Sequence, residues 1–337
     1  MITPAISTTE LYKQLNVVLE TNTPVFIHGS PGIGKSYIVN DIAKNNDYDI
    51  IDVRLSQLDA VDLRGIPSIK NDQTIWMPPV FLPTDMDSKG ILFLDELNSA
   101  PLSVQAAIYQ LVLDRKIGEY SLPKEWRIVC AGNKIDDKGI VFKLPSPLIN
   151  RMVHIVLEAK YDDFKIWAIK NNIHSYIIGF LGFRPDLLTT EVPTANETNP
   201  AFCTPRAWNI LSNILQNIDT KDIGSVAPVI YGSVGYASGI EFLSFVKVYK
   251  TLPDIDRILS GESFEVPEEA SALYALTAAI IERYSDIEQA NNLFTYSEKL
   301  PVEFAVMLIK DLIVKDESIA ELDKFENWLE KYGEYIL

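Results

Sequence analysis

The chain has 337 residues, of which 47% are hydrophobic, and it carries a formal net charge of −16 at pH 7. This length and apolar content can supply the core of one large domain or two modest ones. No apolar run approaches the roughly 18 to 20 residues needed to cross a bilayer, and the start MITPAISTTE lacks the basic and apolar regions of a signal peptide. Two cysteines, Cys130 and Cys203, are too few for a disulfide framework and lack metal-ligand spacing. We therefore expect a soluble, cytoplasmic, globular protein with no membrane insertion and no zinc site.

Short apolar segments alternate with helical patterns in the first half of the chain. Five of these segments are expected to be strands, at residues 25–27, 50–55, 91–94, 128–131 and 153–157. Between the third and the fourth, behind Ser99 and Pro101, apolar residues follow helical spacing at Val104, Ala107, Ile108, Leu111 and Val112. The alternation predicts an α/β domain over residues 1–158, with a parallel five-stranded sheet flanked by helices.

The first strand leads into a phosphate loop, defined here as residues 29–36. These residues fit the pattern G-x-x-x-x-G-K-[ST] and lie between an apolar strand and an amphipathic helix, as phosphate binding requires. Its members are Gly29, Ser30, Pro31, Gly32, Ile33, Gly34, Lys35 and Ser36. The glycines let backbone N–H groups surround phosphate oxygens, Lys35 reaches the β and γ phosphates, and the Ser36 hydroxyl can bind Mg²⁺.

An acidic pair ends the third strand. Residues 90–96 read GILFLDE, a buried type of strand that ends in Asp95 and Glu96. Behind a phosphate loop this is the pattern of a Walker B element, in which Asp95 would hold the Mg²⁺ shell and Glu96 would orient or deprotonate the attacking water. Asn133 follows the fourth strand, where its side chain is suited to hold that water or the γ phosphate.

Two short motifs suggest that the bound nucleotide could carry guanine instead of adenine. Residues 133–136 spell N-K-x-D, the guanine-reading motif of GTPases, and residues 62–65 spell D-x-x-G. The aspartate of D-x-x-G should end a hydrophobic strand, whereas Asp62 follows the segment QLDAV, and the strand-ending acids are Asp95 and Glu96. This placement favours ATP and Mg²⁺ as the cofactors, with a GTPase as the alternative.

Taken in order, GSPGIGKS, ILFLDE and CAGN resemble the Walker A, Walker B and sensor 1 elements of the AAA+ superfamily. The resemblance continues through residues 144–151, LPSPLINR, which look like the short helix that ends in an arginine finger. It implies that Arg151 neutralises charge on the γ phosphate held by a neighbouring subunit, so that ATP is hydrolysed between subunits. Family members usually have an aromatic residue after this arginine, where this chain has Met152.

The second half of the chain is expected to be mainly helical. Residues 164–170, 207–218 and 270–284 have helical patterns, and residues 189–200 form a polar loop. The segment Thr204, Pro205 and Arg206 resembles the start of the sensor 2 helix in an AAA+ lid, which implies that Arg206 contacts the γ phosphate of its own chain. We expect a helical lid over residues 159–250 and a helical C-terminal extension over residues 251–337.

The acidity of the chain is concentrated in that extension. Residues 251–337 hold 19 acidic and 7 basic residues, a net charge of −12, which leaves −4 for residues 1–250. A surface of this kind repels phosphate backbones, so nucleic-acid binding is not expected. Docking of a protein partner is the natural hypothesis for these helices.

Residues 55–67, LSQLDAVDLRGIP, resemble the insertion that follows the second strand in the MoxR and dynein-related branch of the superfamily. Residues 69–77 around Asn71 and Asp72 predict a hairpin, and residues 116–128 predict a second one ahead of sensor 1, as in this branch. By analogy with the family, both loops would face the pore of a ring and handle substrate.

The resemblance implies a homo-hexamer that uses ATP hydrolysis to remodel or assemble a protein client. A client or adaptor with a von Willebrand factor A domain is the implied partner. A DNA-associated AAA+ motor or loader is a second class, against which the acidic balance and the lack of a DNA-binding module count. A nucleotide-gated scaffold without turnover is a third class, and the complete set of Lys35, Asp95, Glu96 and Asn133 argues against it.

Overall fold

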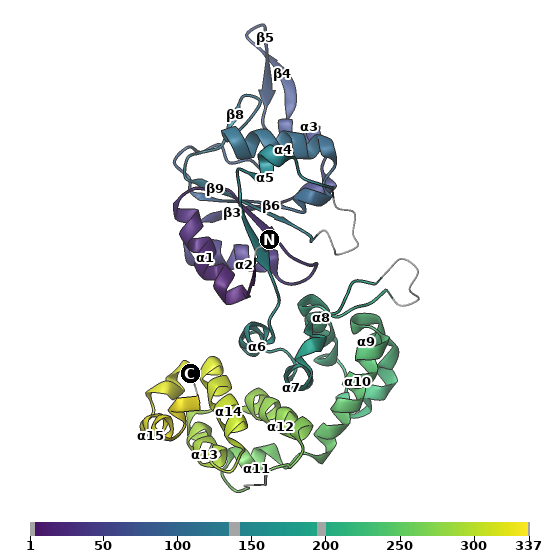
Figure 1. The fold of residues 1–337 in the computed structure, drawn as a ribbon, viewed down its shortest axis with the longest axis vertical. Helices are drawn as coiled ribbons and strands as arrows, with labels where there is room; N and C mark the ends of the chain where they lie inside the picture. The colour runs from purple at the N-terminus through teal and green to yellow at the C-terminus, as the bar shows by residue number, and fades with distance from the viewer. Residues whose placement is uncertain (1–3, 135–141, 194–199, 264, 336–337) are drawn as a thin grey trace. The chain divides into compact units, whose positions relative to one another are not determined.

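The computed structural model describes residues 4–134, 142–193, 200–263 and 265–335 (Figure 1). The chain divides into two compact units, Met1–Ala159 and Lys160–Leu337. Within the described ranges, no helix combines the length and the apolar character that crossing a bilayer requires.

The first unit is built on a six-stranded parallel sheet in the order β1-β10-β2-β9-β6-β3. Its strands are β1 (Ala5–Ile6), β2 (Val25–His28), β3 (Asp49–Arg54), β6 (Gly90–Asp95), β9 (Trp126–Gly132) and β10 (Val153–Leu157). All five predicted strands are present, and the sheet gains a sixth, β1, which pairs with Val156 and Leu157. Two residues are too few to show the alternation of apolar and polar residues that marks a strand, so only the pairing with β10 defines β1.

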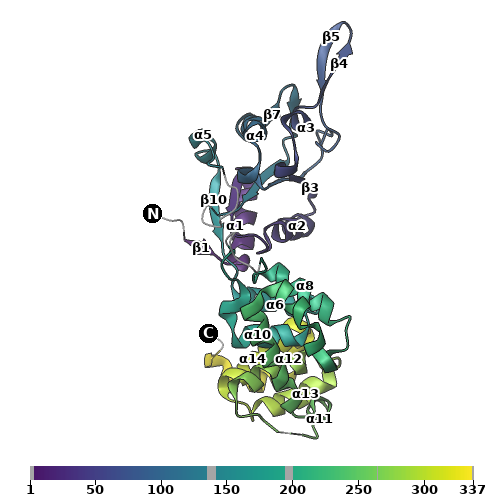
Figure 2. The same ribbon diagram turned by 90° about the vertical axis from the view of Figure 1, so that its right-hand side faces the viewer.

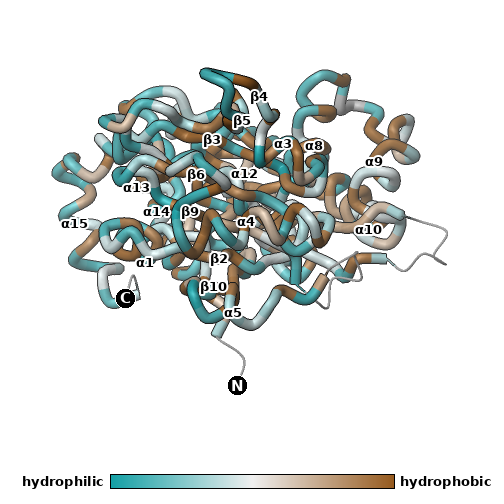
Figure 3. Tube along the Cα trace, turned by 90° about the horizontal axis from the view of Figure 1, so that it is seen from above, coloured by the Kyte–Doolittle hydropathy of each residue, from teal (hydrophilic) through white to brown (hydrophobic). Residues whose placement is uncertain are grey.

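Helices cover both faces of this sheet. They are α1 (Thr8–Glu20), α2 (Lys35–Asn45), α3 (Ala60–Arg64), α4 (Leu102–Asp114) and α5 (Ser146–Ile149). Along β6, Ile91 and Phe93 pack in a core with α1 and α2, whereas Leu92 and Leu94 pack in a second core with α4. A parallel strand buried on both faces is apolar throughout, and Figure 3 shows apolar colouring along the central strands.

Two small antiparallel hairpins extend from the first unit. The first pairs β4 (Ile66–Lys70) with β5 (Gln73–Met77). Asn71 and Asp72 form its turn with φ angles of 52° and 55°, the left-handed conformation that two-residue hairpin turns use. The sequence predicted this hairpin at residues 69–77, and in the structure it begins earlier, at Ile66. Figures 1 and 2 both show it standing away from the sheet.

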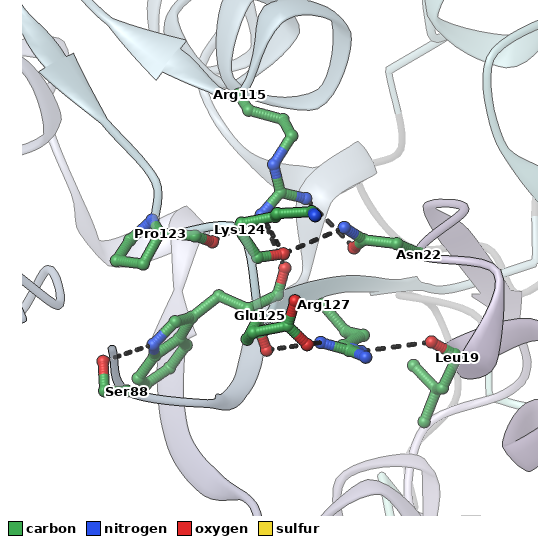
Figure 4. Close-up of polar contacts among 9 residues, drawn as sticks. Leu19, Asn22, Ser88, Arg115, Pro123, Lys124, Glu125 and Arg127 are labelled. Carbon is green, nitrogen blue, oxygen red and sulfur yellow. Dashed lines mark hydrogen bonds and ion pairs between the residues drawn. The ribbon is translucent and has the colours of Figure 1, made fainter. Parts of the chain in front are cut away.

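The second hairpin is shorter than predicted. It consists of β7 (Lys116–Ile117) and β8 (Tyr120–Ser121), because the chain from Trp126 onward joins the main sheet as β9. Arg115, at the end of α4, fixes the segment between β8 and β9 (Figure 4). Its guanidinium donates to the carbonyl oxygens of Pro123 and Trp126, both at 2.7 Å, and to Asn22 Oδ1 at 3.1 Å. These bonds hold the start of the strand that ends just before Asn133.

The second unit is helical, as predicted. Its helices are α6 (Tyr161–Lys170), α7 (Ser175–Phe183), α8 (Pro205–Leu215), α9 (Ala227–Val234), α10 (Tyr236–Val246), α11 (Ile255–Leu259), α12 (Ala270–Arg283), α13 (Ile287–Ser297), α14 (Val302–Lys315) and α15 (Asp323–Tyr332). The helical patterns at 164–170, 207–218 and 270–284 correspond to α6, α8 and α12, and α8 ends earlier than expected. Part of the predicted polar loop, residues 194–199, lies outside the described residues.

Helices on both sides of residue 250 share one interior. Ser175, at the start of α7, donates from its backbone N–H and its hydroxyl to the carboxylate of Glu282 in α12, at 3.0 and 2.6 Å. The ion pair between Lys165 of α6 and the buried Asp311 of α14 has an N–O distance of 2.8 Å. The acidic extension therefore packs against the helices that precede it, and the division at residue 250 stays a proposal.

Candidate nucleotide-binding site

The phosphate loop joins β2 to α2. Gly32 and Gly34 have φ angles of 75° and 100°, in the left-handed region where a side chain would be strained. Gly34 is the N-cap of α2, which begins at Lys35. The first N–H groups of a helix have no partner within it, so this glycine-formed turn presents them, with the positive end of the helix dipole, to an anion. The local backbone fits a bound phosphate group.

Lys35 is buried within the loop, with 8% of its surface exposed. Its Nζ donates to the carbonyl oxygens of Gly29, at 2.5 Å, and Ser30, at 3.1 Å. It also lies 3.5 Å from Oδ1 of Asn133. The cationic group is thereby held between the phosphate loop and the end of β9, where two motifs separated by almost 100 residues meet.

Ser36 and Asp95 come together at the end of the sheet. The Ser36 hydroxyl donates to Asp95 Oδ2 at 3.0 Å, although the two residues belong to α2 and β6. Asp95 is the last residue of β6 and is 9% exposed. Hydroxyl and carboxylate oxygens are the ligands that Mg²⁺ takes beside nucleotide phosphates. The residues present therefore fit the predicted Mg²⁺ site.

Glu96 follows Asp95 in a left-handed conformation, with a φ angle of 60°. Non-glycine residues seldom adopt this conformation, and such positions concentrate at functional sites. Its carboxylate accepts a hydrogen bond from the hydroxyl of Ser56, and its N–H donates to Asp95 Oδ1 at 2.8 Å. Ser56 is the second residue after β3, and its contact with Glu96 was not predicted from the sequence. Only the pairing of β3 with β6 brings it to the acidic pair.

A third carboxylate adds negative charge here. Asp52 lies on β3, and the pKa of its carboxyl group is raised, first by burial and then by the negative charges of Asp95 and Glu96. The positive charge of Arg54 opposes this rise. Asp52 belongs to no motif and was not predicted from the sequence. Asp52, Asp95 and Glu96 thus bring three carboxyl groups close enough to influence one another at this edge of the sheet.

Asn98 holds the backbone of Asn133. Its side chain donates from Nδ2 to the Asn133 carbonyl at 2.8 Å and accepts from the Asn133 N–H, through Oδ1, at 3.1 Å. Gly132 leaves the room for this contact, because a Cβ there would lie 2.3 Å from Asn98 Oδ1. Asn98 is 4% exposed and lies just after the acidic pair, a position to which the sequence analysis gave no role.

Replacing Asn98 by leucine is expected to destabilise the first unit by about 2 to 4 kcal/mol, because it leaves the N–H and carbonyl of Asn133 without their partner. The ATPase rate should fall as well, since the Asn133 side chain loses its fixed position. Thermal unfolding and steady-state turnover measure the two effects. Asn98→Asp is the matched control, because it keeps the acceptor and loses the donor, and it should lie between Asn98→Leu and wild type. Wild-type stability and turnover in Asn98→Leu would contradict this role.

The two predicted arginines lie at exposed positions. Helix α5 ends at Ile149, and Arg151 lies in the turn that follows, whereas the sequence placed it at the end of the helix. Met152, the residue that departs from the family pattern, is buried in the core beneath. Arg206 is the second residue of α8 in the second unit, where the Thr204 hydroxyl caps the helix by accepting from the Ala207 N–H at 3.0 Å. The roles of both arginines stay predictions.

The D-x-x-G segment of the GTPase alternative has a local structural role. Asp62 lies inside α3, and its carboxylate accepts from the N–H of Asp59 at 2.8 Å as part of a capping box. It therefore caps a helix and does not end a strand of the sheet. Asp136, the last residue of the N-K-x-D segment, lies outside the described residues.

Comparison with known proteins gives one family and several relatives. Residues 24–152 match the sequence model of the AAA domain (dynein-related subfamily). A segment of 174 residues is 28% identical to Midasin of Giardia intestinalis and covers 48% of this chain but 4% of that protein. A segment of 146 residues is 26% identical to Midasin of Dictyostelium discoideum and covers 40% of this chain and 2% of that protein.

Among solved structures, a RuvB variant of Thermotoga maritima aligns with 18% identity and a TM-score of 0.38, over 75% of this chain and 74% of that one. The chain spans only a small part of the two Midasin relatives. The family match runs from just before β2 to just after Arg151. It thus contains the phosphate loop, the acidic pair and Asn133. Residues 24–152 of this chain therefore match an AAA domain of the dynein-related subfamily, in agreement with the resemblance seen in the sequence.

Proposed function

We propose that this chain is a MoxR-like ATPase that binds ATP and Mg²⁺ at the phosphate loop, cleaves the bond between the β and γ phosphates, and uses that energy to remodel or assemble a protein client. The observation that carries the proposal is the 3.0 Å hydrogen bond between Ser36 and Asp95, beside the buried amine of Lys35. It supports the proposal because a hydroxyl, a carboxylate and a lysine amine, the groups that would bind Mg²⁺ and phosphate, lie at the same edge of the sheet.

Each residue of the site has a role in this proposal. A bound Mg²⁺ would supply positive charge that offsets the charge of the β and γ phosphates. Ser36 and Asp95 would hold the ion, and Lys35 would bind the phosphates. Glu96 would orient or deprotonate the attacking water after leaving its contact with Ser56, and Asn133 would hold that water or the γ phosphate.

The proposed assembly is a homo-hexamer with ATP bound between subunits. Arg151 is exposed on the first unit, so its guanidinium is available to the active site of a neighbour. Arg206 would contact the γ phosphate of its own chain and couple the nucleotide state to the helical lid. Closed rings need head-to-tail interfaces that repeat around the symmetry axis, which this arrangement supplies.

The two hairpins are the proposed client-binding elements. The N–H of Trp76 in the first hairpin donates to Glu119 Oε2 in the second at 3.4 Å, so the two hairpins lie together. Along the first hairpin Ile66, Ile69 and Met77 are 69%, 82% and 52% exposed. Ile66 and Met77 are opposite each other on the two strands and form an exposed apolar pair, and exposed apolar patches mark protein interaction sites. The family resemblance adds a von Willebrand factor A domain as the candidate partner, in the cytoplasm.

A site-specific crosslinking experiment tests the client. Both native cysteines are buried, and burial raises the pKa of the Cys130 thiol to about 12, so an added surface cysteine can be labelled selectively. Thr74→Cys places a photo-crosslinker on the first hairpin, and Gln14→Cys on the exposed face of α1 is the matched control. Both are made in the Glu96→Gln chain, which is expected to retain ATP.

In lysate of the native host, Thr74→Cys should form protein adducts that require ATP, and Gln14→Cys should not. Mass spectrometry then identifies the client and shows whether it carries a von Willebrand factor A domain. Equal adducts from both positions, or adducts with DNA in place of protein, would overturn the remodelling proposal. DNA adducts would support the motor or loader alternative.

A further inference from the structure

Two of the three histidines in the chain form a hydrogen-bonded pair outside the roles assigned above. His28 Nε2 lies 2.8 Å from His154 Nδ1, and His154 Nε2 lies 2.8 Å from the carbonyl oxygen of Ile149. Their strands, β2 and β10, are parallel neighbours in which His154 is opposite Phe26. The Phe26 ring lies against both imidazoles, with centroid distances of 4.3 Å to His28 and 5.8 Å to His154. The pair is thus packed into the sheet face and partly buried.

The pair joins two functional segments of the first unit. His28 is the last residue of β2 and immediately precedes Gly29 of the phosphate loop. At the other end, Ile149 closes α5, and its carbonyl also accepts from the Met152 N–H at 3.4 Å. That second bond closes the turn that contains Arg151. A continuous set of hydrogen bonds therefore runs from His28, next to the phosphate loop, to the finger turn, defined here as residues 149–152.

The protons of the pair can be assigned from its acceptor. A carbonyl oxygen only accepts, so His154 Nε2 must carry a proton whether that ring holds one proton or two. If the ring holds one, its Nδ1 accepts from His28 Nε2. Burial, together with the positive charges of His154 and Lys35, lowers the pKa of His28 to about 4, so His28 is neutral near pH 7. Both protonation states of His154 keep its bond to Ile149.

We propose that His154 is a positioning residue for Arg151, and that His28 holds His154 in place and thereby joins the finger turn to the phosphate loop. This inference rests on the proposed role of Arg151 as an arginine finger. Helix α5 has only four residues, which is too short to be stable by itself, so the finger turn needs an anchor outside the helix. His154 supplies it through the carbonyl that begins the turn.

His154→Leu removes both hydrogen bonds and leaves Lys35, Ser36 and Asp95 unchanged. The Kd of the full chain for ATP should stay at the wild-type value, while kcat falls by about 10- to 100-fold, the usual cost of misplacing a catalytic group by about 1 Å. In the Arg151→Ala background the same substitution should cause no further fall in kcat, because the residue that His154 positions is already gone.

His154→Gln keeps an amide donor for the Ile149 carbonyl and should recover part of kcat. His28→Leu should lower kcat in the same direction as His154→Leu.

The outcomes distinguish the positioning role of His154 from the arginine-finger role of Arg151. An unchanged kcat in His154→Leu, or an equal fall with and without Arg151, would overturn the positioning role. An unchanged kcat in Arg151→Ala would show that Arg151 is not an arginine finger, and the histidine pair would then have no catalytic residue to position.

NMR of the chain with ¹⁵N-labelled imidazoles tests these hydrogen bonds independently of activity. The signals can be assigned because the chain has only 3 histidines. The spectrum should show a protonated Nε2 on His154 whose resonance shifts in His28→Leu, and an unprotonated Nε2 would contradict the bond to Ile149. Thermal unfolding of each variant checks that the chain is folded.

Discussion

Replacing Arg151 by alanine is expected to lower kcat for ATP hydrolysis by about 10³- to 10⁵-fold, the range over which arginine fingers act. The Kd for ATP should change little, because the finger acts on charge that develops in the transition state. Arg151 is exposed in the finger turn, so the loss of its side chain should leave the core of the first unit intact. Steady-state turnover, equilibrium nucleotide binding and thermal unfolding of the full chain measure these three quantities.

Complementation tests whether Arg151 acts on a neighbour. Arg151→Ala subunits keep their own Glu96, and Glu96→Gln subunits keep their own Arg151. In an equal mixture roughly a quarter of the interfaces in a cyclic ring combine the two intact residues, so turnover should reappear. Native mass spectrometry with ATP and Mg²⁺ establishes that mixed hexamers have formed. Mixed rings without recovered turnover would contradict action in trans, and monomers alone at micromolar concentration would contradict the ring.

Replacing Glu96 by glutamine is expected to lower kcat by about 10²- to 10⁴-fold, the range of general base catalysis. ATP binding should persist, because Lys35, Ser36 and Asp95 are unchanged. Glutamine keeps the size of the side chain and an oxygen that can accept from Ser56, but it cannot take a proton from water. Single-turnover hydrolysis and nucleotide retention distinguish the loss of chemistry from the loss of binding.

The matched control for this variant is Glu20→Gln, which removes an exposed carboxylate at the end of α1. It should hydrolyse ATP at the wild-type rate. Turnover by Glu96→Gln at that same rate would show that another group activates the water. Asp52 would then be the next carboxylate to replace, because burial and the negative charges of Asp95 and Glu96 raise its pKa.

Much of the fold could be predicted because the strands are short, apolar and separated by helical patterns. β6 is apolar from residue 90 to 94 because helices cover both of its faces, and this made it recognisable. The edge strand β1 was missed because two residues carry no periodicity. The second hairpin was predicted too long, because no local signal shows where the chain leaves the hairpin and joins the main sheet at Trp126.

The candidate site could be predicted because only a few residue types can do the chemistry of its motifs. Lys35, Ser36, Asp95 and Asn133 were predicted to act together, and the structure brings them within hydrogen-bonding distance in pairs. The carboxyl ends of neighbouring parallel strands meet at one edge of a sheet, which is why such distant segments converge there.

The sequence by itself determined the α/β class of the first unit, the helical class of the second, the phosphate loop and the acidic pair, because these depend on local pattern and on residue chemistry. Only the tertiary structure decided that Ser56 contacts Glu96, that Asn98 holds Asn133 and that His28 meets His154. These contacts depend on strand order and on register, which are set by how the whole sheet packs. No short stretch of sequence encodes these contacts, because the two partners of each lie far apart in the chain and meet only when the sheet and its helices pack together.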